Sequence, residues 1–208
     1  MISKDVMAKY IHGSNSLDGI TLSLEQTAQL LEREPSLSDS EEFFAPDGKG
    51  FEAGLVTGHK NALLTTLNLA KTGALVTVDT ILELHRDLMG DLLLSAGEYR
   101  ECSLRIKGLL IPSPPESLDE RMKGLVNLIA VGLEKAKDKN QLAWRVHHEF
   151  FTIHPFIEGN GRMARLLLNF IKYRAKNELA VLSYADRERY GKAIIDFQKQ
   201  KIERARAK

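Results

Sequence analysis

The sequence predicts a mainly α-helical protein with one small β-hairpin. Apolar residues recur three and four positions apart through most of the 208 residues, which is the spacing of helices that bury one face. The exception is residues 97–111, where two short apolar runs flank a Lys-Gly dipeptide like two strands around a turn. Pro112, Pro114 and Pro115 end that region sharply. At this length the chain can bury a sizeable core without disulfides or metal staples.

The helices before the hairpin are bounded by glycine, proline and capping residues. The spacing predicts a helix over residues 3–13 that Gly13 interrupts, and a second short helix over residues 14–18 that stops at Gly19. Glycine most easily takes the left-handed conformation that follows a helix end. A helix is also expected over residues 21–34, with Thr21 or Ser23 as its cap, and residues 36–49 form a loop. Two more helices are expected over residues 52–71 and 80–89, and the second has Thr77 or Asp79 as its cap.

Two helices with apolar stripes are expected on either side of His154. Helical patterning covers residues 117–135 and 140–153, and the buried stripe of the second range ends at Ile153. Pro155 prevents that helix from continuing, so His154 stands at its C-terminal end. The next helix carries its stripe on Met163, Leu166, Leu167, Phe170 and Ile171, and Arg162, Arg165 and Asn169 share the other face.

Composition and charge exclude several classes of function. Lys+Arg 29 against Asp+Glu 28 leaves a net charge of +1, so no overall attraction draws the chain to nucleic acid or to an anionic membrane. The longest wholly apolar runs hold three or four residues, far short of the ~20 needed to cross a bilayer. Cys102 is the single cysteine, which rules out an intrachain disulfide and favours a reducing compartment. We expect a soluble cytoplasmic protein that binds neither nucleic acid nor membrane.

The segment that carries chemistry is residues 154–165, His-Pro-Phe-Ile-Glu-Gly-Asn-Gly-Arg-Met-Ala-Arg. It opens a helix, where unpaired N–H groups bind anions, and Gly159 and Gly161 let phosphate oxygens approach the backbone. Its two arginines, one turn apart, add bidentate donors. Glu158 is placed to hold magnesium, which takes one or two carboxylates together with phosphate oxygens. His154, with an ordinary pKa near ~6.5, suits a general base, so the pattern indicates polyphosphate chemistry.

Other nucleotide-binding motifs fit less well. Residues 159–164 match the dinucleotide pattern G-x-G-x-x-A, but they follow a helix instead of a strand, and no βαβ unit surrounds them. The nearest approach to a P-loop, residues 54–60, has the wrong spacing and lacks the final Ser or Thr. The sequence therefore predicts neither of these folds.

Residues 154–165 resemble the signature of the Fic (filamentation induced by cAMP) family, H-P-F-x-[DE]-G-N-G-R-x-x-R, at every fixed position. The resemblance implies a Fic-type helical domain that transfers AMP from ATP to a Tyr, Thr or Ser hydroxyl of a protein and releases pyrophosphate. The flanking segments that look like the family's are residues 81–86, 97–100, 112–116 and 186–190. The division that we expect is an N-terminal inhibitory region over residues 1–50, a Fic catalytic core over 51–195 and a helical tail over 196–208.

The resemblance also implies roles for the loop residues. His154 would be the base that deprotonates the target hydroxyl, and Glu158 would hold Mg2+ across the α- and β-phosphates of ATP. Gly161 is informative, because relatives that phosphorylate instead of adenylylating carry Lys at this position. The implied phosphate-binding residues are Gly159, Asn160 and Gly161 as an anion hole, Arg162 for the β-phosphate and Arg165 for the γ-phosphate.

The hairpin would serve as a flap in this family. A flap aligns the target segment by strand addition, a mode that recognises backbone more than side chain. It would span residues 103–111, with Leu104, Ile106 and Gly108 as candidate contact residues. The remaining candidates are Asn169 and Tyr190 for the nucleotide pocket, while His85, His147 and His148 are interpreted as structural.

An N-terminal segment resembles the inhibitory helix of many Fic proteins, [ST]-x-x-x-E-[GN]. Ser14 and Asp18 lie one turn apart on the same helix face, and Gly19 follows. The resemblance implies that the acidic residue pairs with Arg165 and so excludes the γ-phosphate. Asp18 stands where the family has Glu, and aspartate is one methylene shorter. We therefore expect an incomplete ion pair and weaker inhibition than in Glu-containing relatives.

Two other functions stay open at this point. A protein of the same fold could mainly remove AMP from its target, although Asp18 in place of Glu counts against that reaction. A catalytically silent scaffold would bind nucleotide in the same loop without transferring any group. For the enzyme, the expected partners are ATP, a protein target that the sequence does not identify, and the chain itself through auto-modification. The oligomeric state is left open, with a homodimer among the options.

Overall fold

Helices make up the regular structure of residues 2–32, 49–106 and 112–207, the part of the chain that the computed structural model describes, and no strand occurs there. The predicted α-helical class is confirmed. The elements are α1 Lys4–Leu17, α2 Leu24–Glu32, α4 Lys49–Thr72, α5 Val78–Met89, η1 Pro115–Ser117, α6 Leu118–Lys135, α7 Lys139–Ile153, α8 Asn160–Lys176, η2 Tyr184–Asp186 and α9 Arg187–Arg206.

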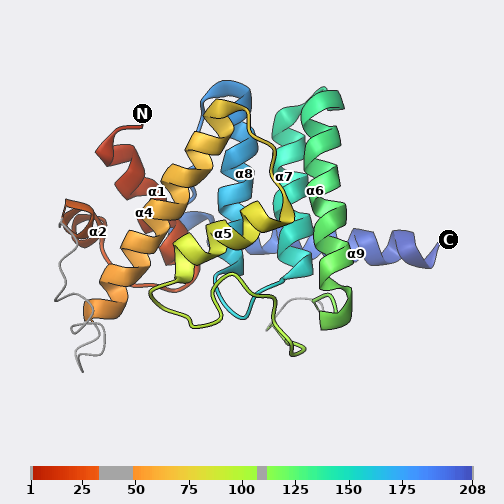
Figure 1. Cartoon of the computed structure of the whole chain (residues 1–208), viewed down its shortest axis with the longest axis horizontal. Coiled ribbons are helices and arrows are strands. Elements are labelled where there is room, and N and C mark those ends of the chain that lie inside the picture. The colour runs from red at the N-terminus through yellow and green to blue at the C-terminus, as the bar shows by residue number, and fades with distance from the viewer. Residues whose placement is uncertain (1, 33–48, 107–111, 208) are drawn as a thin grey trace.

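Helix α8 lies at the centre of the bundle. It packs against α7 on one side and α4 on the other, and α6 packs on the far side of α7 (Figure 1). Helix α5 contacts α4 and α8, and α1 and α2 both contact α4. Helix α9 packs on α7 and then runs away from the bundle to the C terminus (Figure 1). The apolar stripe predicted for α8 is buried in full: Met163, Leu166, Leu167, Phe170 and Ile171.

The capping residues that the sequence offers decide where α2 and α5 begin. Ser23 Oγ accepts from Gln26 N at 3.1 Å, and Ser23 N donates to Gln26 Oε1 at 2.7 Å, so this pair closes a capping box before α2. Thr77 and Thr80 form the equivalent box before α5. Of the two candidates at each start, Ser23 and Thr77 are therefore the caps. The loop predicted over residues 36–49 lies outside the described residues, apart from residue 49, which begins α4.

The predicted break of the first helix at Gly13 is wrong, because α1 continues through Gly13 to Leu17. Gly13 serves packing instead. A β-carbon at this position would lie 1.9 Å from the carbonyl oxygen of Leu182, so only glycine lets α1 approach that segment. Gly19 behaves as predicted, since it follows the helix with a φ of +92°.

The predicted hairpin is not found in its described half. Residues 101–106, which include Leu104 and Ile106, have no regular secondary structure, while residues 107–111, with Gly108, lie outside the described residues. The backbone here bonds elsewhere: Arg100 N donates to the Pro155 carbonyl at 2.9 Å, and the Cys102 carbonyl accepts from the Arg100 guanidinium at 2.6 Å. These groups are therefore not used in a strand ladder.

Helix α9 is continuous across residue 195, where the core was expected to give way to a tail. Its inner face holds Tyr190 and the buried Ile194 against the rest of the bundle. Within the described ranges, no helix combines the length and the apolar character needed to span a bilayer.

Candidate active site

The loop between α7 and α8 begins with a strained histidine. His154 caps α7 with φ 52° and ψ 61°, a left-handed conformation that few residues other than glycine adopt. Its N–H still donates to the Phe150 carbonyl at 2.9 Å, and Pro155 then stops the helix. Backbone strain of this kind costs roughly 1–3 kcal/mol and persists only where the surroundings fix it. The predicted position of His154 at the end of a buried helix is confirmed.

A buried histidine on α5 supports the middle of the loop. The His85 ring stacks on Phe156 with centroids 3.6 Å apart and an interplanar angle of 6°. His85 Nδ1 accepts from Gly97 N at 2.8 Å, so Nε2 carries the proton and donates to the Glu158 carbonyl at 3.1 Å. Burial lowers the pKa of His85 to about 4, which keeps this tautomer neutral. His85 is structural, as expected, and its specific task is to hold the loop.

Asn160 closes the loop on itself. Its Oδ1 accepts from Phe156 N at 3.0 Å, and its Nδ2 donates to the Phe156 carbonyl at 2.8 Å. The side chain thus faces the loop interior, and what Asn160 offers to an anion is its backbone N–H at the first position of α8. Gly159, with φ +77°, makes the turn into the helix.

The start of α8 is an anion-binding arrangement. The N–H groups of its first residues have no intrahelical carbonyl, and Arg162 lies among them with an exposed fraction of only 4%. Arg162 Nε and Nη1 make no hydrogen bond within the described residues, although Nε lies 3.6 Å from Asp18 Oδ2. Buried donors are almost always bonded in folded proteins, so these two indicate a site for a charged acceptor.

The second arginine of the loop is bound by the N-terminal helix. Arg165 is buried, and its Nε donates to Ser14 Oγ at 2.7 Å while Nη2 donates to the Ser14 carbonyl at 2.9 Å. Nη2 also donates to Asp18 Oδ2 at 2.7 Å, and the pair is a full salt bridge. The prediction that aspartate is too short to complete this pair is therefore wrong. The close packing of α1 at Gly13 brings the helix near enough.

Comparison with known proteins agrees with this geometry. A family model described as Fic/DOC matches residues 75–171, which contain the whole loop.

Residues 75–171 form a Fic domain.

Curated relatives of this Fic domain are named protein adenylyltransferases. The chain is 29% identical over 189 residues to protein adenylyltransferase Fic of Nematostella vectensis, covering 90% of this chain and 42% of the relative. It is 30% identical over 185 residues to protein adenylyltransferase fic-1 of Caenorhabditis elegans, covering 87% of this chain and 34% of the relative. The chain thus spans less than half the length of either relative.

Solved structures show the same fold. A Fic-domain-containing signalling protein from Bacteroides thetaiotaomicron superposes with a TM-score of 0.76 at 26% identity, covering 92% of this chain and 71% of that one. Fic-1 from C. elegans, residues 134–508, superposes with a TM-score of 0.73 at 29% identity, covering 91% of this chain and 54% of that one. Both alignments extend beyond residues 75–171 to most of the chain.

His154 of the Fic domain is in the protonation state of a base. Burial lowers its pKa to about 4, the hydrogen bond to the Phe151 carbonyl opposes that shift, and the nearby Arg100 cation lowers the pKa further. The imidazole is therefore neutral at pH 7. Nδ1 lies 3.3 Å from the Phe151 carbonyl, which can only accept, so this contact places the proton on Nδ1 and leaves the lone pair on Nε2.

Glu158 is the one acidic residue of residues 154–165, the Fic loop. Its side chain is exposed, and Oε1 accepts from Gly159 N at 3.1 Å, which holds the carboxylate at the mouth of the α8 N-terminus. In the described ranges no three His, Cys, Asp or Glu residues cluster as a metal site. A single carboxylate fits Mg2+ that takes its other ligands from phosphate oxygens and water, and does not fit a metal held by protein alone.

The two residues predicted for the nucleotide pocket differ in their placement. Tyr190 OH accepts from Arg165 Nη1 at 3.2 Å and lies 2.7 Å from His147 Nε2, so α9 does reach the site. Asn169 is wholly buried and braces the chain, because it bonds to the Arg165 carbonyl and to both backbone groups of Ala180. The structure brings Tyr190 to Arg165, one of the two arginines predicted to bind phosphate, and it bonds Asn169 to the backbone of Arg165 and Ala180.

Residue patterns missed Arg100, which the structure places directly behind His154. Its Nε donates to the His154 carbonyl at 2.7 Å. Arg100 belongs to the Gly-Glu-Tyr-Arg segment that resembles the family's, and nothing in its spacing marks it as a neighbour of a residue 54 positions away.

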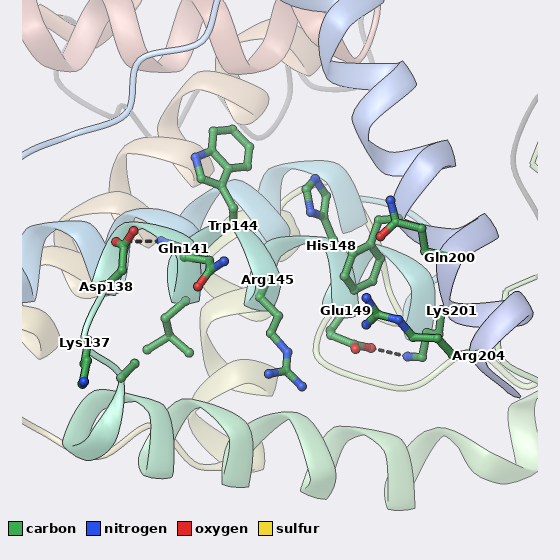
Figure 2. A pocket seen from close by; sticks show the side chains of 13 residues that line it. Lys137, Asp138, Gln141, Trp144, Arg145, His148, Glu149, Gln200, Lys201 and Arg204 are labelled. Carbon is green, nitrogen blue, oxygen red and sulfur yellow. Dashed lines mark hydrogen bonds and ion pairs between the residues drawn. The ribbon is translucent and has the colours of Figure 1, made fainter. Parts of the chain in front are cut away.

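The site is distinct from a hollow that opens elsewhere on the bundle. This hollow has a volume of about 670 Å3. Figure 2 shows the side chains that line it from α7 and α9. Trp144, Arg145 and His148 line it from α7, and Lys201, which pairs with Glu149, lines it from α9. None of the residues 154–165 contributes to its wall.

Proposed function

We propose that this chain is a protein adenylyltransferase that moves AMP from ATP to a hydroxyl of a protein. The observation that carries the proposal is the neutral imidazole of His154 beside the anion-binding start of α8, where Arg162 has two unbonded donors. The names of the curated relatives support the same activity. The target residue would be Tyr, Thr or Ser.

The proposed step is an in-line substitution at the α-phosphorus. His154 Nε2 takes the proton of the target hydroxyl, and the hydroxyl oxygen forms a bond to the α-phosphorus. The bond from that phosphorus to the bridging oxygen of the β-phosphate breaks, and pyrophosphate leaves with Arg162 beside its charge. Such positioning and charge stabilisation are the main protein contributions to phosphoryl-type transfers.

Glu158 is the residue that would hold Mg2+ in this proposal. The ion would neutralise charge on the α- and β-phosphates. The chain's own contribution is the exposed carboxylate, which the Gly159 N–H steadies. Gly159, Asn160 and Gly161 would meet the phosphates through their backbone N–H groups.

We also propose that α1 inhibits the enzyme. Arg165 would bind the γ-phosphate, and in the structure its donors are taken by Ser14, Asp18 and Tyr190. A β-carbon built at Gly161 would lie 2.8 Å from Asp18 Oδ1, so the Asp18 carboxylate also occupies space directly over the helix start. ATP would therefore bind fully only when α1 shifts or Asp18 turns away.

The experiment that tests the transfer compares ATP labelled at the α-phosphate with ATP labelled at the γ-phosphate. The chains are the wild type, Asp18→Gly, and Asp18→Gly combined with His154→Ala. We expect protein-bound label from α-labelled ATP alone, more with Asp18→Gly than with the wild type, and none after His154→Ala although ATP still binds. Auto-modification or a labelled lysate protein serves as the acceptor.

The outcomes separate the other functions. Label transferred from the γ-position would indicate phosphorylation and contradict the proposal. If the wild type and Asp18→Gly both bind ATP and neither transfers AMP, the protein is a scaffold. If a modified acceptor loses label faster than an unmodified acceptor gains it, the protein mainly removes AMP.

A further inference from the structure

Arg100 is a buried guanidinium, and each hydrogen bond that it donates to a described residue goes to a backbone carbonyl. The residue is 3% exposed, and its Nε donates to the His154 carbonyl at 2.7 Å. Nη1 donates to the Cys102 carbonyl at 2.6 Å, and Nη2 donates to the Ser113 carbonyl. No carboxylate pairs with it in the ranges that the structure describes. A buried charge without a counter-ion is costly, so its presence requires a reason.

The three carbonyls belong to two parts of the chain that the proposed reaction must bring together. Cys102 and Ser113 stand just outside residues 103–112, the segment that carries the predicted flap. His154 is the proposed base, and its carbonyl defines the peptide plane that leads into Pro155. The backbone N–H of Arg100 adds a fourth bond, to the Pro155 carbonyl at 2.9 Å. A single residue therefore joins both ends of the flap segment to the start of the Fic loop.

The backbone conformation of His154 explains why the hydrogen bond from Arg100 is needed. A left-handed backbone at a non-glycine residue is strained and would relax without external bonds. Phe150 fixes the N–H of His154, and Arg100 fixes its carbonyl. Together these two bonds set the direction in which the imidazole projects. The planar fork of arginine can reach three separate carbonyls, whereas the point charge of lysine cannot match that geometry.

We propose that Arg100 is a positioning residue that locks the left-handed backbone of His154 to both ends of the flap segment. The inference rests on the proposed function, in which a target hydroxyl presented along the flap must meet His154 Nε2. Arg100 touches neither the reacting atoms nor the start of α8. Its removal should therefore affect transfer and leave ATP binding intact.

The test compares Arg100→Lys with Arg145→Lys in the 208-residue chain that carries Asp18→Gly. Arg145 is an exposed arginine of α7 and serves as the matched control. We expect Arg100→Lys to lower the rate of AMP transfer at saturating ATP by about 100-fold, the usual effect of a misplaced catalytic group. The dissociation constant for ATP should stay within about threefold. Arg145→Lys should change neither quantity.

A second readout does not depend on activity. In the same chains labelled at histidine, NMR reports the His154 ring, assigned by its loss in His154→Ala. We expect Arg100→Lys to shift or broaden that resonance while the His85 resonance, which reports the loop interior, stays in place. Circular dichroism checks that the helical fold is retained.

Each outcome decides between the claims. Transfer within about threefold of the parent, or a parallel loss of transfer and ATP binding, would overturn the role of Arg100 and leave the proposed function standing. A parent chain that transfers no AMP would overturn the proposed function. In that case an unchanged His154 resonance in Arg100→Lys would overturn this inference too, and a shifted one would support it.

Discussion

Arg165 is the residue for which Asp18 and an incoming polyphosphate would compete. Burial by itself lowers the pKa of this guanidinium, but Asp18 and Tyr190 more than offset that effect and the pKa is raised. The same carboxylate lies 3.6 Å from Arg162 Nε. Asp18 therefore balances two buried cations with one charge. An incoming polyphosphate would offer the same arginines more charge, so the two anions compete.

Replacing Asp18 by Asn should weaken the protein and improve its substrate binding at the same time. The charge that stabilises Arg165 is lost and a buried cation is left without its counter-ion, so we expect a decrease of about 3 kcal/mol in the free energy of unfolding, at the low end for a buried pair because the Asp18 side chain is 29% exposed. ATP affinity should rise roughly tenfold, within the usual range of coupling between competing ligands. Urea unfolding and isothermal titration calorimetry measure the two effects. Asp5→Asn, exposed on the same helix, should leave ATP affinity unchanged; equal affinity in Asp18→Asn and the wild type would contradict the competition.

The buried histidines should make stability depend on pH. His85 has a folded-state pKa of about 4 because of burial, against an ordinary value of 6.5 in the unfolded chain. Below pH 6.5 the unfolded chain binds the extra proton, so stability falls as pH drops from about 6.5 towards 4. His154 acts in the same direction. At pH 5 the loss is at most about 2 kcal/mol for each of these groups.

Urea unfolding at pH 7 and pH 5 measures this dependence. His85→Gln removes one titrating group, so the difference between the two pH values should shrink even though the variant is less stable at pH 7. A stability that is constant or rises from pH 7 to pH 5 in the wild type would contradict the assignment of neutral buried imidazoles.

Helix α1 is the element that would inhibit the enzyme in our proposal. It touches the core through a close backbone approach at Gly13 and through a buried hydrogen bond in which Asn15 Oδ1 lies 3.0 Å from His59 Nδ1. Ser14 and Asp18 then meet Arg165 from the same face. The spacing of one turn between Ser14 and Asp18 could be predicted from the sequence. Whether their side chains contact Arg165 could not, because that depends on how closely the helix packs.

Gly13→Ala should therefore loosen α1. The added β-carbon would lie 1.9 Å from the Leu182 carbonyl oxygen, so the helix must move, at a cost of about 1–3 kcal/mol. Asp18 would retreat from Arg165, and ATP affinity should rise. The control is Gly124→Ala in α6, where a β-carbon meets nothing within 4 Å and a stabilisation of about 0.5–1 kcal/mol is expected. Thermal unfolding and calorimetry of both variants provide the check; a Gly13→Ala chain as stable as the wild type would contradict the packing argument.

At the scale of the whole molecule, local sequence patterns predicted most helices but did not predict the long-range contacts. The stripe on α8 and the stop at Pro155 placed the Fic loop correctly, because both depend on neighbours in the chain. Arg100 and its bond to His154 depend on a fold that brings together residues 54 positions apart. The hairpin prediction failed over residues 101–106, where the Cys102 carbonyl accepts from the Arg100 side chain and the backbone has no regular secondary structure.

The most direct test of the central claim is the intact mass of the full chain after incubation with ATP and Mg2+. For Asp18→Gly we predict a gain of one or more AMP groups on hydroxyl side chains, with pyrophosphate released in equal amount. The combination of Asp18→Gly with His154→Ala should gain none while it still binds ATP. An equal gain of AMP in both chains would show that His154 is not the base and would contradict the account.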